Sequence, residues 1–202
     1  MSMRAVIATH NRHKAGEMIT ILSRAFPDWE FLTLADFPNA TEPEETGSTY
    51  AENAAIKSES AAKETGCLCI ADDAGLEIDA MNGEPGLYSK RFAGEDTPFP
   101  EKMQIILERL SGVSEEHRSA RFRCCVAISI PNDGEMRTEV VETTCEGRIA
   151  ESPSGSGGFG YDPIFWLPEM GCTMADLTAD QKHAISHRGK ALALVAQKLR
   201  EL

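Results

Sequence analysis

The segment CLCIADDAG, residues 67–75, joins a short apolar run to two adjacent carboxylates. The apolar residues 67–71 are typical of a buried strand, which we predict to end at Asp72–Asp73. Adjacent carboxylates repel one another and are poorly solvated when partly buried, so they cost stability. Sheets of α/β proteins place their functional sites beyond the carboxyl ends of strands. The pair is therefore a candidate site, although a solvated acidic turn explains it equally well.

Strand-like and helical segments alternate on both sides of this run. The periodicity of apolar residues predicts strands at 3–9, 29–34, 118–130 and 135–149. It predicts helices before Pro27, from Thr49 to Gly66, after a cap at Thr97–Pro98, and from about Ser186. A turn at 131–134 makes the two long strands a hairpin, so the predicted class is α/β with a mixed sheet. Because there are no repeats or linkers, we expect a single domain of residues 1–202.

Composition narrows the function. The net charge of −12 argues against a nucleic acid as partner, because a phosphate backbone needs a basic surface. The chain has no apolar run of about 18 residues, and its start does not resemble a signal peptide, so we expect a cytoplasmic protein that does not bind a membrane. Its six cysteines lack metal-site spacing and are expected to be reduced core residues. A small phosphorylated ligand remains compatible with this composition, through local donors and a divalent cation.

Two further segments carry groups that suit a nucleotide. Residues 9–14, THNRHK, lie at a predicted strand-to-helix junction, where unpaired N–H groups favour phosphate. Residues 154–162, SGSGGFGYD, combine glycines with two rings and a carboxylate. Lys182 and the stretch 186–188 add donors before the last helix. Taken alone, residues 9–14 are compatible with an ordinary capped helix and residues 154–162 with a flexible loop. Lys182 and the stretch 186–188 are compatible with a solvated helix start.

The paired aspartates would suit Mg²⁺, which accepts one or two protein carboxylates together with waters and phosphates. Either aspartate could instead activate a water molecule. Glu44–Glu45, in the preceding polar loop, could complete the metal site or could be solvated charge.

The order of these motifs is more specific than any one of them. ATHNRHK, EETGSTYAENAAIKS, IADDAGLEIDAMNGEPGLYSKRFAG, GSGGFGYDPIF and LTADQKHAISHRGKAL follow one another between residues 8 and 192. In this order they resemble the inosine triphosphate pyrophosphatase family, also called the dITP/XTP pyrophosphatases. The resemblance covers nearly the whole chain.

The resemblance implies a long mixed β-sheet flanked by helices, in two lobes with a central cleft. It also implies hydrolysis of ITP, dITP or XTP to the monophosphate and pyrophosphate, a requirement for Mg²⁺, and a homodimer. Asp73 is then the catalytic base, and Glu44 and Asp73 are the metal-associated carboxylates. The nucleotide contacts that the resemblance implies are Thr9, Asn11, Lys14, Lys57, Phe159, Gly160, Tyr161, Asp162, Lys182, His187 and Arg188.

Two positions depart from the family's pattern. His10 stands where many members have glycine, and its Cβ could narrow the approach of a phosphate. Ala74 stands where many members have serine, so a hydroxyl is missing. If either departure spoils the chemistry, the alternative is a nucleotide sensor without catalysis. A separate alternative of related chemistry is a Maf-type pyrophosphatase acting on pyrimidine or other modified nucleotides.

Overall fold

The strand that carries the two aspartates does not end at them. In the computed structural model, β3 spans Leu68–Ile78 and passes through Asp72 and Asp73. The predicted end at Asp72 is wrong, because the apolar alternation resumes after two small residues. Leu76 and Ile78 are both fully buried, so the strand continues into a second apolar environment.

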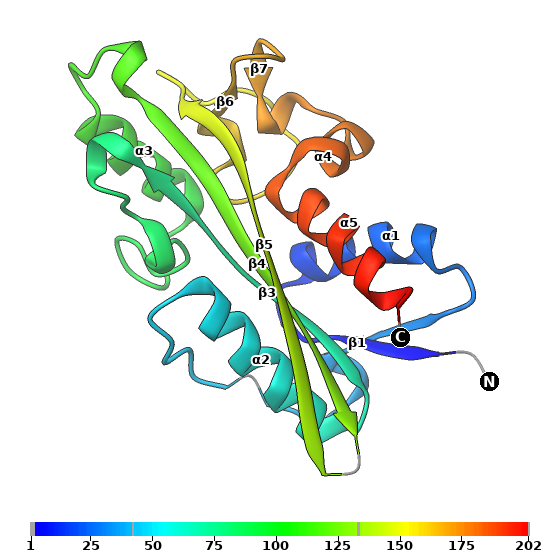
Figure 1. The fold of residues 1–202 in the computed structure, drawn as a ribbon. Helices are drawn as coiled ribbons and strands as arrows, with labels where there is room; N and C mark the ends of the chain where they lie inside the picture. Colours follow the sequence, from blue (N-terminus) through cyan, green and yellow to red (C-terminus); the bar gives the residue numbers. More distant parts are fainter. Residues whose placement is uncertain (1–2, 42, 133, 202) are drawn as a thin grey trace. The chain divides into compact units, whose positions relative to one another are not determined.

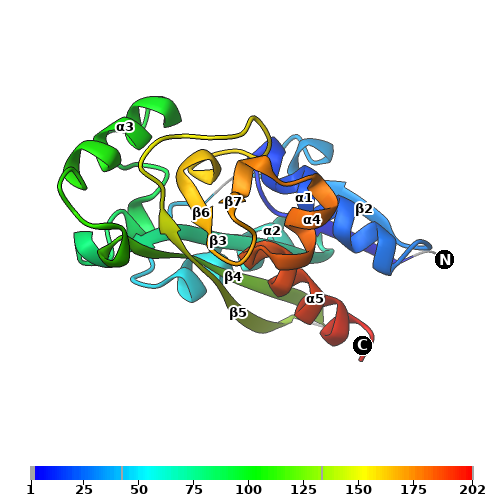
Figure 2. The same cartoon turned by 90° about the horizontal axis from the view of Figure 1, so that it is seen from above.

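Seven strands form one mixed sheet. The structure describes residues 3–41, 43–132 and 134–201, so the predicted turn at 131–134 lies partly outside the described residues. The strand order is β2-β1-β3-β4-β5-β6-β7, with β1 parallel to β2 and β3, and β6 antiparallel to β5 and β7. β4 and β5 run side by side along their length in Figures 1 and 2. The other strands are β1 (Arg4–Ile7), β2 (Glu30–Thr33), β4 (Ser119–Asn132), β5 (Glu135–Ile149), β6 (Phe165–Leu167) and β7 (Cys172–Thr173). The predicted mixed α/β class is confirmed.

The chain forms two compact units. Unit 1 consists of Met1–Asp73, Cys124–Thr143 and Arg188–Leu202, and unit 2 of Ala74–Arg123 and Thr144–His187. The chain passes from unit 1 to unit 2 directly after Asp73, so both aspartates belong to unit 1.

Unit 1 contains α1 (Arg12–Ala25), α2 (Tyr50–Thr65) and all but the first residue of α5 (His187–Leu199). In Figure 1, α2 lies on one side of the strands and α1 and α5 lie on the other. Small side chains, Ala61 and Ala62, let α2 pack against Val6, Cys69 and Ala71 of β1 and β3. Gly66 ends α2 with a φ of 67°, a left-handed conformation in which glycine has no steric penalty.

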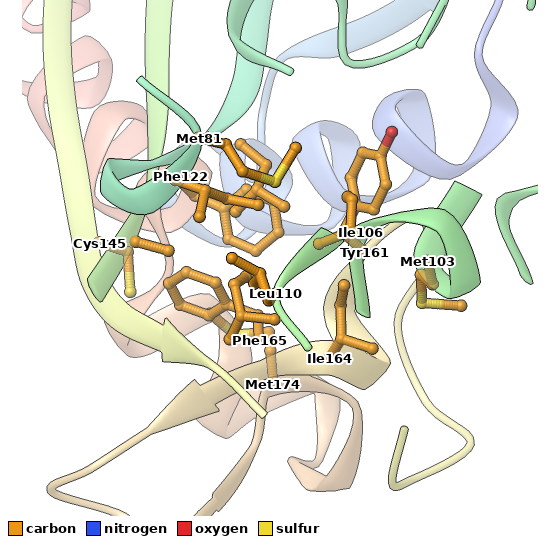
Figure 3. Close-up of a cluster of buried hydrophobic side chains, with 14 of the residues drawn as sticks. Met81, Met103, Ile106, Leu110, Phe122, Cys145, Tyr161, Ile164, Phe165 and Met174 are labelled. Atoms are coloured by element: carbon orange, nitrogen blue, oxygen red, sulfur yellow. The ribbon is translucent and has the colours of Figure 1, made fainter. Parts of the chain in front are cut away.

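Unit 2 contains α3 (Phe99–Arg109) and α4 (Ala179–Ile185) around a second core. Figure 3 shows this core, in which Met103 and Ile106 of α3 meet Ile164 and Phe165. The core is built from residues between 76 and 177 and includes Tyr161, so it anchors the end of the glycine-rich loop at 154–162.

Most of the predicted boundaries agree with the structure, and the differences are small. The hairpin strands and the second strand are confirmed within two residues. The N-cap of α3 is Pro98 rather than Thr97, whose hydroxyl instead donates to the carbonyl of Ala93. The short elements α4, β6 and β7 were not predicted, because they are too brief to show a hydrophobic period.

In the part of the chain that the structure describes, no helix has both the length and the apolar composition needed to cross a membrane.

We expect Gly147→Ala to destabilise the protein by about 1–3 kcal/mol, because it overpacks the β5–β6 contact. A Cβ at Gly147 would lie 2.6 Å from the carbonyl oxygen of Trp166 and 2.7 Å from the ring of Phe165. Gly16→Ala in α1 is the matched control. Nothing lies within 4 Å of a Cβ there, so the same change should raise the free energy of unfolding by about 0.5–1 kcal/mol through helix propensity. Urea denaturation measures both, and equal effects at the two positions would contradict this account.

Candidate active site

Asp72 is the most deeply buried carboxylate of unit 1, with 1% of its surface exposed. Arg188, near the start of α5, donates from Nε and from one terminal nitrogen to Oδ2, at 3.1 and 2.8 Å. Lys14 of α1 places Nζ 3.2 Å from Oδ1. Another terminal nitrogen of Arg188 donates to Glu17 at 2.7 Å. One carboxylate thus joins α1, β3 and α5.

Burial alone would raise the pKa of Asp72. Lys14 and Arg188 outweigh that effect and hold the pKa of this carboxyl well below its usual range. Asp72 is therefore a fixed anion whose charge is compensated within unit 1.

Asp73 has a different environment from its neighbour. Its Oδ1 lies 3.1 Å from Nζ of Lys57, and its Oδ2 accepts a 3.3 Å hydrogen bond from the side-chain amide of Asn53. Lys57 and Asn53 lie four residues apart, one turn of α2, so both point the same way. About a tenth of the Asp73 side chain remains exposed.

Burial raises the pKa of Asp73, and the nearby carboxylate of Glu45 adds to the rise, while Lys57 and Lys14 oppose it. Burial would lower the pKa of Lys57, but Asp73, Asp72 and Glu45 raise it above its ordinary value, so the ammonium stays charged. The two aspartates therefore have pKa values displaced in opposite directions. Such a separation is typical of a pair that combines an electrostatic support with a proton acceptor.

Glu45 is the loop carboxylate that the structure brings to this cluster. Its Oε1 lies 2.9 Å from Nζ of Lys57, so this ammonium contacts both Glu45 and Asp73. Glu44, the residue predicted from the resemblance, is exposed. Successive residues of an extended loop point in opposite directions, and the sequence pattern does not say which of the two faces inward.

The junction before α1 is formed as predicted at Asn11, which caps the helix. Its Oδ1 accepts from the backbone N–H groups of His13 and Lys14, and Thr9 Oγ1 accepts from the N–H of Asn11. Only Asn82 and Ala93 have positive φ among the non-glycine residues that the structure describes. His10 therefore keeps an ordinary backbone, and its departure from glycine introduces no strain.

In unit 2, Asp162 organises the glycine-rich loop. Its Oδ2 accepts from the backbone N–H of Phe159 at 2.9 Å and from Nζ of Lys182 at 2.7 Å. The same ammonium lies 4.6 Å from the centroid of the Phe159 ring, a cation–π distance. The structure thus brings together Phe159, Asp162 and Lys182, which are predicted from two separate motifs.

Tyr161, in contrast, belongs to the core of unit 2. Its ring lies in the cluster of Figure 3, and its hydroxyl donates to the carbonyl of Ser89 at 2.8 Å. Gly160 beside it has a φ of 67°, which lets the loop turn between Phe159 and Tyr161. Tyr161 therefore supports the loop, and Phe159, which is half-buried, is the ring suited to stacking.

His187 is also buried. Its ring stacks on Phe122 with a centroid separation of 4.7 Å. The sequence predicts that it contacts the nucleotide, together with Arg188. The structure gives both side chains internal partners, within unit 2 for His187 and within unit 1 for Arg188.

Comparisons with known proteins cover nearly the whole chain. The model of the Ham1 family matches residues 5–198. The chain belongs to the Ham1 family. A dITP/XTP pyrophosphatase of Geobacillus kaustophilus is 47% identical over 98% of this chain and 94% of its own length. One of Bacillus subtilis is 45% identical over 96% of each. The names of these relatives confirm the resemblance predicted from the motifs.

Solved structures of the Ham1 family agree with the fold. A HAM1 protein from Coxiella burnetii superposes with a TM-score of 0.87 at 40% identity, over 99% of this chain and 100% of that one. The Staphylococcus aureus Ham1 protein gives 0.85 at 41% identity, over 98% of both chains. The sheet and helices of this chain are therefore those of the Ham1 family.

Two residues that contact this cluster, Glu17 and Asn53, lie outside the predicted set. Glu17 is three residues after Lys14, and Asn53 four residues before Lys57, so each shares a helix face with a predicted lysine. That spacing could have identified both. The sequence identifies Glu45 only together with Glu44, as a pair of candidate carboxylates.

The carboxylates of unit 1 are compatible with Mg²⁺. In the part of the chain that the structure covers, no three His, Cys, Asp or Glu side chains gather as a complete metal cage. Mg²⁺ does not need one, because it is commonly held by one or two carboxylates plus waters and substrate phosphates. Glu45 and Asp73, which both contact Lys57, are two neighbouring carboxylates of the kind that this coordination uses.

We expect Asp72→Asn to lower the free energy of unfolding by about 3–5 kcal/mol, because it leaves Arg188 and Lys14 buried without their shared anion. Glu30→Gln is the control: it breaks the exposed pair with Arg4 and should cost less than about 1 kcal/mol. Urea denaturation without nucleotide compares the two. An Asp72→Asn protein as stable as Glu30→Gln would show that this network does not hold unit 1 together.

Proposed function

We propose that this Ham1-family protein hydrolyses non-standard purine nucleoside triphosphates such as ITP, dITP and XTP, releasing the monophosphate and pyrophosphate. The names of the curated relatives support this substrate class. The observation that carries it here is the pair Asp72–Asp73, whose pKa values are displaced in opposite directions amid Lys14, Lys57 and Arg188. A centre with one fixed anion, one proton acceptor and several cations suits attack of water on a polyphosphate.

In this proposal Asp73 accepts a proton from the attacking water. The water oxygen forms a bond to the α-phosphorus, and the bond to the bridging oxygen of the β-phosphate breaks, so pyrophosphate leaves. Asp73 suits this step because its pKa is raised and part of its side chain is exposed. Asp72 is fully paired and serves to hold Lys14 at the phosphates.

We assign the two metal-associated carboxylates to Asp73 and Glu45, in place of Glu44, because Glu45 is the one that contacts Lys57. Bound Mg²⁺ would supply positive charge to the phosphate oxygens. Lys14 and Lys57 offset the remaining charge of the triphosphate. Thr9 and Asn11 fix the start of α1, whose dipole also favours an anion.

The base is assigned to Phe159, Asp162 and Lys182 of unit 2. The Phe159 ring offers a stacking face, and Lys182 offers a donor. Hypoxanthine and xanthine present O6 as an acceptor, whereas adenine presents an amino group that would leave such a donor unpaired. Arg188 is not needed for this recognition, since Asp72 and Glu17 already take its guanidinium. Its part is to support Asp72.

Membership of the Ham1 family counts against a Maf-type pyrophosphatase. A sensor without catalysis stays an alternative that the first experiment below distinguishes. The homodimer that the resemblance implies and the cytoplasmic location expected from the sequence remain predictions.

We expect Asp73→Asn to lower kcat for dITP by about 10²–10⁴-fold, the usual contribution of a general base. Pyrophosphate release with Mg²⁺ measures this, over a panel of dITP, XTP, dATP, dGTP and dTTP. Wild type should favour dITP and XTP. Asp28→Asn, an exposed change of the same kind, should leave the rate unaltered. Full activity of Asp73→Asn would exclude Asp73 as the base, and binding of dITP without turnover by wild type would indicate the sensor.

We expect Phe159→Ala to raise KM for dITP by about 10-fold or more, since stacking on one aromatic ring is worth roughly 1–3 kcal/mol per base. kcat should change less, because the ring does not touch the phosphates in this assignment. Phe159→Tyr keeps the ring and should keep KM. If both variants bind dITP like wild type, the base does not stack on Phe159.

A further inference from the structure

We propose that Asn53 is a positioning residue for the reaction: it holds Asp73 and the loop of Glu45 in their working arrangement. This inference rests on the proposed role of Asp73. Asn53 lies in the first turn of α2 and is 2% exposed, so its amide is available only to groups inside unit 1.

The amide of Asn53 makes two contacts of opposite kind. Its Oδ1 accepts from the backbone N–H of Gly47 at 2.8 Å, and its Nδ2 donates to Oδ2 of Asp73 at 3.3 Å. The orientation of the amide follows from these partners, since an N–H needs an acceptor and an ionised carboxylate needs a donor. Asparagine supplies an acceptor and a donor on two separate atoms of one short side chain. An ionised aspartate has no donor, serine has a single oxygen on a shorter side chain, and alanine has neither group.

Both oxygens of Asp73 are thereby fixed from α2. Lys57 holds Oδ1 and Asn53 holds Oδ2, from positions one helical turn apart. With a single partner the carboxylate could rotate about its last bond. With two partners its plane is set, and with it the direction in which a lone pair meets a water molecule.

The contact to Gly47 fixes the second carboxylate. Glu45 lies two residues before Gly47 in the loop that leads into α2, and it reaches the same ammonium as Asp73. Ser48 is tied to Glu52, but that bond lies further from Glu45 in the chain. Asn53 therefore anchors the loop two residues after Glu45, and it links the positions of the two carboxylates that we assign to the metal.

The contact between Asn53 and the loop also requires that position 47 has no side chain. A Cβ on Gly47 would lie 2.6 Å from Oδ1 of Asn53 and 2.7 Å from Cβ of Glu52. Gly47 does not have a positive φ, so the requirement for glycine comes from this close approach rather than from backbone conformation.

Asn53→Asp separates the two contacts. An aspartate keeps an acceptor for the N–H of Gly47 but replaces the donor to Asp73 with a repelling oxygen. We expect hydrogen exchange of the Gly47 amide, measured without nucleotide or metal, to stay slow. We expect kcat for dITP to fall on the order of 10- to 100-fold with KM nearly unchanged, as for a reacting group displaced by about 1 Å. Asn132→Asp, the same change at the exposed end of β4, should alter neither.

Two further variants keep the inference testable if Asn53→Asp does not fold. Asn53→Ser should speed exchange at Gly47 and lower kcat. Gly47→Ala keeps Asn53 but displaces its amide, and should also lower kcat more than KM changes. A folded Asn53→Asp protein with wild-type kcat would overturn the positioning role. So would wild-type kcat in both of the single variants, Asn53→Ser and Gly47→Ala. If instead Asp73→Asn keeps full activity, it is the proposed role of Asp73 that fails, whatever the Asn53 variants do.

Discussion

The arrangement of unit 1 depends on one buried anion, the carboxylate of Asp72. A charge at 1% exposure is tolerable only when opposite charges meet it, and Arg188 and Lys14 do so from two different helices. The need to neutralise the buried charge of Asp72 therefore fixes where α1 and α5 contact β3. Lys14, which we assign to the phosphates, is placed by the same requirement, so in this proposal stability and site geometry have a common cause.

Asp72 and Asp73 are adjacent in β3, but their side chains have different environments. Successive side chains of a strand point to opposite faces, so Asp72 and Asp73 meet different helices. Asp72 faces α1 and α5 and is fully compensated. Asp73 faces α2, where Lys57 and Asn53 each contact one of its oxygens and leave part of the side chain exposed. The difference in pKa follows from the alternation of the strand.

In unit 2 a single buried carboxylate, that of Asp162, has a comparable role. Asp162 binds the N–H of Phe159 and the ammonium of Lys182, so it fixes the loop and the cation together. A Cβ on Gly158 would lie 2.1 Å from Oδ2 of Asp162, which explains a glycine at that point of the loop. In both units a buried carboxylate orders the groups that we assign to the nucleotide.

The sequence by itself determined the α/β class, the long hairpin, the capped starts of α1 and α2, and the family, because these depend on local periodicity and on motif order. Tertiary structure alone decided the partners of the site residues. It made Arg188 the counter-ion of Asp72, brought Glu45 rather than Glu44 to Lys57, and brought Asn53 to Asp73. These outcomes depend on which side chains meet across elements far apart in the chain, and that is set by burial and by charge compensation in the folded protein.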